Sequence, residues 1–209
     1  MSNFGFLQLR VVNPYDVAFL EARSAIGASG VLQQAQEYRN VRDAIGDCSL
    51  VIGTMALNHR ELQHPVMRLD QSRQSLSGNA GPIALLFGSE KVGLSNEDLS
   101  YCHSILHIPT CAENVSMNLG QAVAVCLYEL IRESNESTLP LLWNDPATAQ
   151  ELERLTSVLS NALAASGYVK EGAAQSTTEK VRRLVRRLNL SSEDTKLLLG
   201  MIRKICPRE

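Results

Sequence analysis

The sequence has no apolar run long enough to cross a bilayer. Its longest near-continuous apolar stretch, AVAVCLYELI from Ala122 to Ile131, is about half of what a membrane-spanning helix needs, and charged residues follow it. No charged segment followed by an apolar one opens the chain, so nothing indicates a secretory signal. The five cysteines are dispersed and form no C-x-x-C pair, which favours a reduced, cytoplasmic setting.

Several common ligand-binding motifs are also missing. No G-x-G-x-x-G follows an expected strand and no G-x-x-x-x-G-K-[ST] occurs, so neither a Rossmann dinucleotide site nor a P-loop is supported. No motif supports a Ser-His-Asp site. His103, His107 and Cys111 recur every four residues, but in a strand that spacing spans about 13 Å, too far for shared ligation. We therefore expect no metal site.

Charge is unevenly distributed along the chain. Residues 1–179 hold 11 Lys and Arg against 19 Asp and Glu, a net −8, whereas residues 180–209 hold 9 against 3, a net +6. A basic segment on an acidic body favours a polyanionic partner, nucleic acid first. The alternative is a solvated basic helix without a partner.

The first 133 residues alternate between strand-like and helix-like segments, which predicts an α/β fold with a parallel sheet covered on both faces. Residues 58–81 are polar with little periodicity and predict a long, mobile loop at the carboxyl side of a strand. Strands are expected at 6–12, 49–54, 82–88 and 104–110, and helices at 16–26, 41–48 and 117–132.

The remainder of the chain predicts a small helical unit. Residues 134–150 are polar and contain prolines, which is typical of a linker. Apolar residues then recur at helical spacing in three segments, beginning near Leu152, Val181 and Leu197. We expect a domain over 1–133, a linker over 134–150, and a basic helical extension over 151–209 that cannot bury its apolar stripes alone.

Three expected strands run into small or polar loops: IGTMA at 52–56, FGSEKVGL at 87–94 and IPTCAENVSMNL at 108–119. Glycine and small residues let main-chain groups approach a ligand closely. Three stretches, taken in order, resemble motifs 2 and 3 of the SpoU (TrmH-like) branch of the SPOUT RNA methyltransferases. They are FGSEKVGLSNEDL, then IP, then SMNLGQAVAVCLYEL. RVVNP, CSLVIGTMA and the helical basic extension further resemble the TrmJ, or LasT-like, group of tRNA 2′-O-methyltransferases.

This resemblance implies a C-terminal trefoil knot in the α/β domain, S-adenosylmethionine as cofactor, and a homodimer in which each subunit completes the other's site. The cofactor is expected to be held mainly by main-chain groups, with Leu94 and Leu119 as apolar walls. The implied cofactor-binding residues are Thr54, Met55, Ala56, Gly88, Leu94, Ile108, Val115, Ser116, Met117 and Leu119.

Glu90 and Asn118, with Ser116 beside the cofactor, are implied as the catalytic positioning groups. The alternative for Glu90 and Asn118 is a helix N-terminal carboxylate and a capping amide. The basic helix of the extension is expected to bind the phosphates of tRNA, or alternatively of rRNA. The residues expected to do so are Arg182, Arg183, Arg186 and Arg187. The alternative is a dimer-facing helix paired with acidic residues of the main domain.

The chain departs from the group at one motif. Relatives carry N-x-G-x-x-x-R on the first helix, and its arginine is thought to help deprotonate the 2′-hydroxyl; these 209 residues do not contain it. Either the start of the chain is truncated or misassigned, with the first strand and most of the first helix missing, or the chain is a non-catalytic RNA- or cofactor-binding relative. In both cases we expect little or no methyltransferase activity from this chain, with cofactor binding retained.

Overall fold

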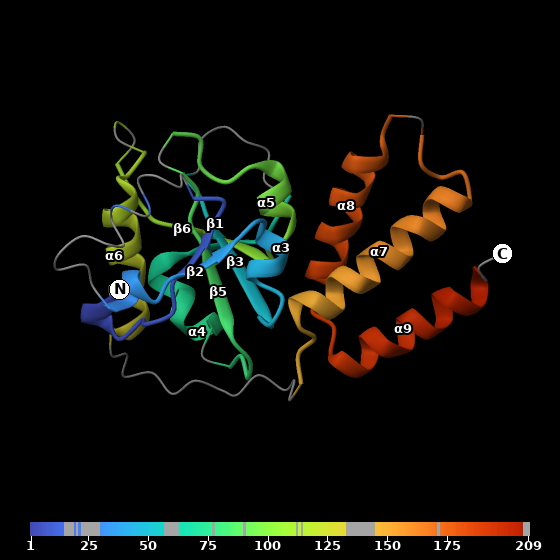
Figure 1. The fold of residues 1–209 in the computed structure, drawn as a ribbon, viewed down its shortest axis with the longest axis horizontal. Helices are drawn as coiled ribbons and strands as arrows, with labels where there is room; N and C mark the ends of the chain where they lie inside the picture. The colour runs from blue at the N-terminus through green and yellow to red at the C-terminus, as the bar shows by residue number, and fades with distance from the viewer. Residues whose placement is uncertain are drawn as a thin grey trace.

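An α/β body and an arm of three helices make up the computed structural model (Figure 1). It describes residues 1–14, 19, 21, 30–56, 63–76, 78–89, 91–111, 113, 115–132, 145–170 and 172–206. The helix expected at 16–26 and most of the expected linker lie outside these residues. No helix among the described residues is long and apolar enough to span a membrane.

The main sheet has four parallel strands in the order β4-β6-β3-β5. Neighbouring residues of its central strands enter different cores: Val51 and Ile105 pack on one face, Ile52 and Leu106 on the other. Apolar residues at successive positions therefore mark a sheet covered on both faces, as expected for parallel strands. The strands are β3 (Leu50–Thr54), β4 (Val66–Arg68), β5 (Ile83–Leu86) and β6 (Ser104–His107).

A separate two-stranded parallel sheet joins β1 (Arg10–Val12) to β2 (Gln36–Tyr38). β1 occupies only the end of the strand expected at 6–12, and β2 was not predicted because QEY shows no apolar alternation. Arg10 ties this sheet to the body, since its Nη2 donates to Asp47 Oδ2 at 2.7 Å. The short helices η1 (Ser2–Phe4), α2 (Gly30–Gln33) and α3 (Val41–Ala44) complete this region.

The prediction of a long loop over 58–81 is wrong for its central part. This segment contains β4, the 3-10 helix η2 (Leu69–Gln71) and the helix α4 (Ser72–Leu76). Leu69 and Leu76 anchor it by entering the same core cluster as Ile52 and Leu106. Elements of three to five residues are too short to show a periodic pattern in the sequence.

Two helices of the body begin at side-chain caps. Ser95 and Asp98 form a capping box at the start of α5 (Asn96–Ser100). Asn118 caps α6 (Leu119–Ile131), close to the helix expected at 117–132. Cys102 and Cys126 are fully buried and serve as small core residues.

The arm consists of α7 (Ala149–Ala165), α8 (Ala174–Arg187) and α9 (Ser192–Ile205), so all three expected helices are confirmed. They share a core of their own, built around Leu152, Leu155, Val181, Val185 and Leu199. The first residue of α7, Ala149, belongs instead to the core of the body. The domain limits at 133 and 150 and the trefoil knot stay predictions.

Candidate functional site

Three loops start side by side at one edge of the main sheet. In the parallel register, Gly53 of β3 lies opposite Leu86 of β5 and Ile105 of β6. The loops that follow these strands therefore leave from the carboxyl edge together, which is where open α/β sheets bind ligands. Hydrogen bonds fix the first loop there: Thr54 Oγ1 donates to the Leu86 carbonyl oxygen at 2.9 Å and Met55 N–H to that of Leu106 at 3.3 Å.

The second loop, 87–94, turns back on itself at Gly88. Gly93 N–H donates to the Ser89 carbonyl oxygen at 2.8 Å, and Gly93 takes a φ of 71°. A Cβ on Gly88 would lie 2.1 Å from the carbonyl carbon of Gly93, a distance that no real contact allows. The missing side chain of Gly88 therefore lets the loop close, and the contact of Gly88 with a ligand stays a prediction. Glu90 lies outside the described residues.

Leu94, at the end of this loop, lies in the hydrophobic core rather than on an open surface that could face a ligand. Its side chain is 7% exposed and packs with Val51 and Ile105. It also packs closely on Gly53, since a Cβ added to Gly53 would lie 3.1 Å from Leu94 Cδ1. Leu94 therefore supports β3 from one side, which the expectation of a ligand-facing wall did not anticipate.

The third loop, 108–118, ends at the cap of α6. Asn118 Oδ1 accepts from the Gly120 N–H at 2.9 Å and from the Gln121 N–H at 3.4 Å. This is the capping amide that the sequence offered as the alternative, and it fixes the orientation of the side chain. Ile108, Val115, Met117 and Leu119 are half-buried, whereas Ser116 is exposed.

The lining of these loops has a chemistry of its own. Its half-buried side chains are apolar or small, among them Met55, Ala56, Phe87, Ile108 and Val115. A lining of that kind fits a ligand with flat apolar and hydroxyl-bearing parts, such as a nucleoside, better than a compact ion. Among the described residues, no group of three His, Cys, Asp or Glu side chains could hold a metal ion.

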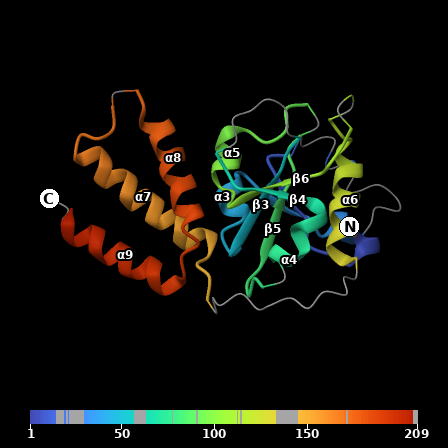
Figure 2. The ribbon, with the colours of Figure 1, turned by 180° about the vertical axis from the view of Figure 1, so that it is seen from behind.

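The basic helix lies at the opposite edge of the sheet. Arg182 on α8 donates from Nη1 to Ser100 Oγ at 2.8 Å, and its guanidinium lies 4.1 Å from the centre of the Tyr101 ring. Both partners precede the amino end of β6. In Figures 1 and 2 α8 lies beside α5, while α6 is on the far side of the body. The structure therefore does not bring the four predicted RNA-binding arginines together with the three loops.

Arg182 and Arg186 are buried, at 7% and 1% exposure, which corrects the prediction that all four arginines face RNA. Arg182 forms a two-bond ion pair with Glu153 of α7, from Nε at 2.9 Å and Nη2 at 3.1 Å. Burial alone lowers the pKa of Arg182, but the bonds to Glu153 outweigh it and the pKa is raised. No local sequence pattern indicates this partner, because the two residues lie on different helices.

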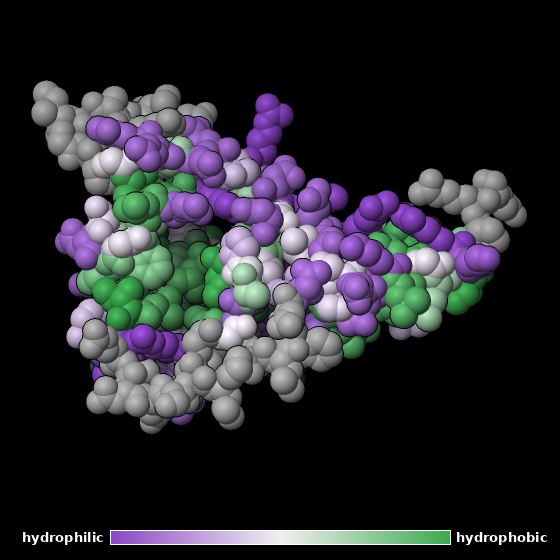
Figure 3. All heavy atoms as spheres, turned by 90° about the horizontal axis from the view of Figure 1, so that it is seen from below, coloured by the Kyte–Doolittle hydropathy of each residue, from purple (hydrophilic) through white to green (hydrophobic). Residues whose placement is uncertain are grey.

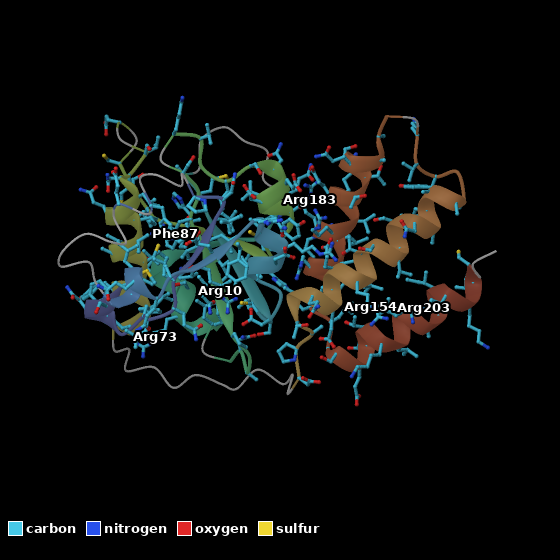
Figure 4. All side chains as sticks on the ribbon, in the orientation of Figure 1. Arg10, Arg73, Phe87, Arg154, Arg183 and Arg203 are labelled. Atoms are coloured by element: carbon cyan, nitrogen blue, oxygen red, sulfur yellow. The ribbon has the colours of Figure 1, made fainter. Side chains whose placement is uncertain are left out.

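Arg186 has fewer hydrogen-bond partners than Arg182 among the described residues. Its Nη2 donates to the Ala149 carbonyl oxygen at 3.2 Å, while Nε and Nη1 have no partner among the described atoms. Burial lowers its pKa to about 10. Of the other two arginines, Arg187 is exposed and Arg183 lies 3.9 Å from Glu179, where α8 meets the body (Figure 4). Of the four arginines, only Arg187 is fully open to a polyanion, and the Arg183 side chain is 13% exposed.

His103 sits at the same edge. Its Nδ1 accepts from the Val51 N–H at 3.0 Å, so the ring acts as a neutral acceptor between β3 and β6. Burial lowers the pKa of His103 to about 3, with the Arg186 charge adding in the same direction. The ring is therefore part of the sheet's hydrogen bonding.

Comparison with known proteins agrees with this arrangement. The profile of the SpoU rRNA Methylase family matches residues 1–128. The tRNA (cytidine/uridine-2′-O-)-methyltransferase TrmJ of Citrobacter koseri is 34% identical over 215 residues, covering 98% of this chain and 87% of that protein. The enzyme of the same name from Sodalis glossinidius is 32% identical, with 98% and 83% covered.

Among solved structures, the crystal structure of TrmJ from Z. mobilis ZM4 superposes with a TM-score of 0.85 at 30% identity, covering 98% of this chain and 89% of that one. The fold class expected from the sequence, parallel strands covered by helices, is thus confirmed at the level of the whole chain. The motif resemblance read from the loops after β5 and β6 is confirmed as well, and the chain belongs to the SpoU rRNA methylase family, with TrmJ proteins among its relatives.

Proposed function

We propose that this chain binds S-adenosylmethionine and directs it to the ribose 2′-hydroxyl of an RNA, tRNA before rRNA. The observation that carries the proposal is the convergence of the loops after β3, β5 and β6 at one edge of the sheet, in a chain of this family. The TrmJ relatives are named for tRNA 2′-O-methylation, which favours tRNA as the substrate class.

The cofactor is proposed to lie against main-chain groups of Thr54, Met55, Ala56 and Gly88, and of the third loop at Ile108 and 115–117. Half-buried Leu119 would close its apolar side. When bound, S-adenosylmethionine supplies a methyl group already activated on a sulfonium, so the protein's task is alignment and proton removal. This task is proposed for Glu90, Ser116 and Asn118.

Asn118 suits a positioning role because its cap holds the side chain at the first turn of α6. The cap engages Oδ1 and leaves the Nδ2 hydrogens for a substrate oxygen. An orientation fixed before substrate arrives reduces the entropy lost on alignment. The same contact also satisfies the purely structural alternative, so a variant must separate the two.

The absence of N-x-G-x-x-x-R from these 209 residues leads us to propose weak or absent methyl transfer by this chain alone. The runner-up function is a non-catalytic protein that binds the cofactor or RNA. Association of two copies, with each completing the other's site, belongs to the same proposal, as does a cytoplasmic setting.

The deciding experiment measures two quantities on the purified 209-residue chain. Calorimetry with S-adenosylhomocysteine is expected to show binding, and transfer of labelled methyl to unmodified tRNA is expected to be far slower than for a TrmJ relative assayed in parallel. Absence of cofactor binding would overturn the site. Transfer at the relative's rate would overturn the proposal of weak activity, and binding with no transfer at all would select the non-catalytic alternative.

Asn118→Ser separates positioning from capping, because serine retains a cap oxygen but lacks the amide. We expect the thermal midpoint and S-adenosylhomocysteine affinity to stay near those of the parent, while residual methyl transfer falls by about tenfold to a hundredfold. Asn118→Ala, which loses both, should also lower stability. If the serine variant transfers methyl as the parent does, Asn118 is a cap only.

A further inference from the structure

The outer face of α9 carries an apolar stripe that no described residue covers. Leu197, Met201 and Ile205 are 59%, 49% and 77% exposed. They recur at every fourth position, so they follow one another along the same side of the helix. The opposite side of α9 packs in the arm's core through Leu198, Leu199 and Ile202. Hydrophobic surface between hydrophilic residues is visible on the arm from below (Figure 3).

Charges of opposite sign stand at the two ends of this stripe. Glu193 lies in the first turn of α9, and Arg203 and Lys204 lie in the last. At 100° per residue, Glu193 and Lys204 fall on the same side as Leu197 and Met201. Both charged side chains are exposed, and neither takes part in any of the ion pairs among the described residues.

Gly200 is exposed and lies beside the stripe, about 60° around the helix from Leu197 on the side of Lys204. A Cβ added there would meet nothing within 4 Å, so the glycine is not required by packing inside the arm. It leaves a shallow place on the helix surface where another backbone can approach. A glycine inside a helix is less favourable than alanine, and no described residue makes a close contact at Gly200 that requires it.

We propose that this face is a contact between two copies of the chain, with the two α9 helices packed antiparallel about a two-fold axis near their midpoints. Antiparallel pairing is self-complementary here. It places Leu197 of each copy against the same stripe of the other near Met201, and it brings the acidic end of each helix to the basic end of its neighbour. Parallel pairing would instead set like charges together.

The chemistry of the face favours a second copy over an RNA. Nucleic-acid binding is driven mainly by cations that neutralise phosphates, whereas this stripe has apolar residues at its centre and a carboxylate at one end. The same carboxylate disfavours an anionic membrane surface. A 14-residue helix is about 21 Å long, so the contact is small and is expected to depend on concentration.

This contact does not rest on the proposed cofactor site, which lies in the body. Sedimentation of the intact chain over a range of concentrations tests it, whatever other association the body makes. Leu197→Asp with Met201→Asp is expected to lower the mass reached at high concentration to that of any association made by the body alone. Tyr168→Asp, which changes an exposed apolar residue outside α9, is expected to leave it unchanged. Circular dichroism checks that the arm remains helical in each variant.

A charge exchange then tests the orientation. Glu193→Lys and Lys204→Glu are each expected to weaken association about tenfold, and the double variant to regain most of the parental affinity. Equal mass for the parent and the Leu197→Asp/Met201→Asp chain would overturn the contact. Failure of the Glu193→Lys/Lys204→Glu double variant to regain association would overturn the antiparallel arrangement. Loss of tRNA or vesicle binding by the Leu197→Asp/Met201→Asp chain, without any change in its mass, would overturn it too.

Discussion

At the scale of single residues, Gly88 decides whether the loop after β5 can close. The space that a side chain would need is filled by the peptide between Gly93 and Leu94. Because that obstacle is backbone rather than the end of a flexible side chain, the loop itself has to move when the residue is enlarged.

Gly88→Ala is therefore expected to lower the free energy of unfolding by about 1–3 kcal/mol and to weaken S-adenosylhomocysteine binding. Urea denaturation and calorimetry measure the two effects. Gly46→Ala is the matched control, because the nearest atom to its Cβ lies at 3.7 Å, an ordinary contact. Equal losses in both variants would mean that glycine itself, rather than the closure of this loop, is responsible.

His103 gives the fold a specific sensitivity to acid. Its pKa is about 3 in the folded chain because of burial, against about 6.5 when unfolded. Between these values only the unfolded chain takes up the proton. Stability is thus complete above pH 6.5 and falls as the pH drops, at up to 1.36 kcal/mol per pH unit for this one group.

His103→Asn keeps an acceptor for the Val51 N–H but cannot titrate. We expect urea denaturation at pH 7, 6 and 5 to show a shallower loss of stability for this variant than for the parent. Some loss should remain, since burial also lowers the pKa of His64. Identical pH profiles would show that the His103 ring is protonated without cost in the folded chain.

At the scale of elements, α8 attaches the arm to the body through charged groups that are almost wholly enclosed. Arg182 reaches both Glu153 on α7 and Ser100 at the end of α5. Breaking such a pair strands the other charge in the interior, which typically costs 3–5 kcal/mol. Exposed ion pairs are worth far less.

Glu153→Gln and Arg182→Ala are each expected to destabilise the chain by about 3 kcal/mol or more, as read from thermal or urea denaturation. Replacing both with Leu and Met should restore much of the loss. Arg187→Ala on the same helix, which removes an exposed side chain, should cost about 0.5 kcal/mol or less. Similar losses for Arg182→Ala and Arg187→Ala would argue against an enclosed pair.

The elements also show what a sequence reveals. Long helices such as α7 and α9 repeat their apolar pattern often enough to be found. The strands β3, β5 and β6 each contain successive apolar residues because both faces of the sheet are covered. β2, β4 and α4 were missed, since three to five residues give no period. Ion pairs between helices, such as Arg182 with Glu153, depend on how the helices pack in the tertiary structure. The local sequence therefore does not predict them.

Across the whole molecule, the basic arm and the candidate site lie at opposite edges of one sheet. A strand of five residues such as β3 puts roughly 15 Å between those edges. The loop motifs predicted the site's family, but the charge pattern alone could not show that the arm lies on the other side. An RNA that uses both surfaces of one subunit has to extend around the body, or reach the site of a second subunit.

For this reason Arg183→Ala with Arg187→Ala is expected to weaken tRNA binding and to reduce the slope of log affinity against log salt by roughly 1.4–1.8, while calorimetric affinity for S-adenosylhomocysteine stays the same. Arg39→Ala, an exposed arginine on the body, is the control. Unchanged tRNA affinity and slope in the double variant would remove the arm from RNA binding.

The root of the arm has a consequence for exchanging parts between relatives. Ala149 begins α7 but is buried in the core of the body, and its N–H donates to the Cys48 carbonyl oxygen. A chimera joined before this residue would replace the arm and would also remove Ala149 from the core of the body. A graft that retains the native first turn of α7 and joins after Leu152 would keep the body sealed, and only then would differences in RNA preference report on the donated helices.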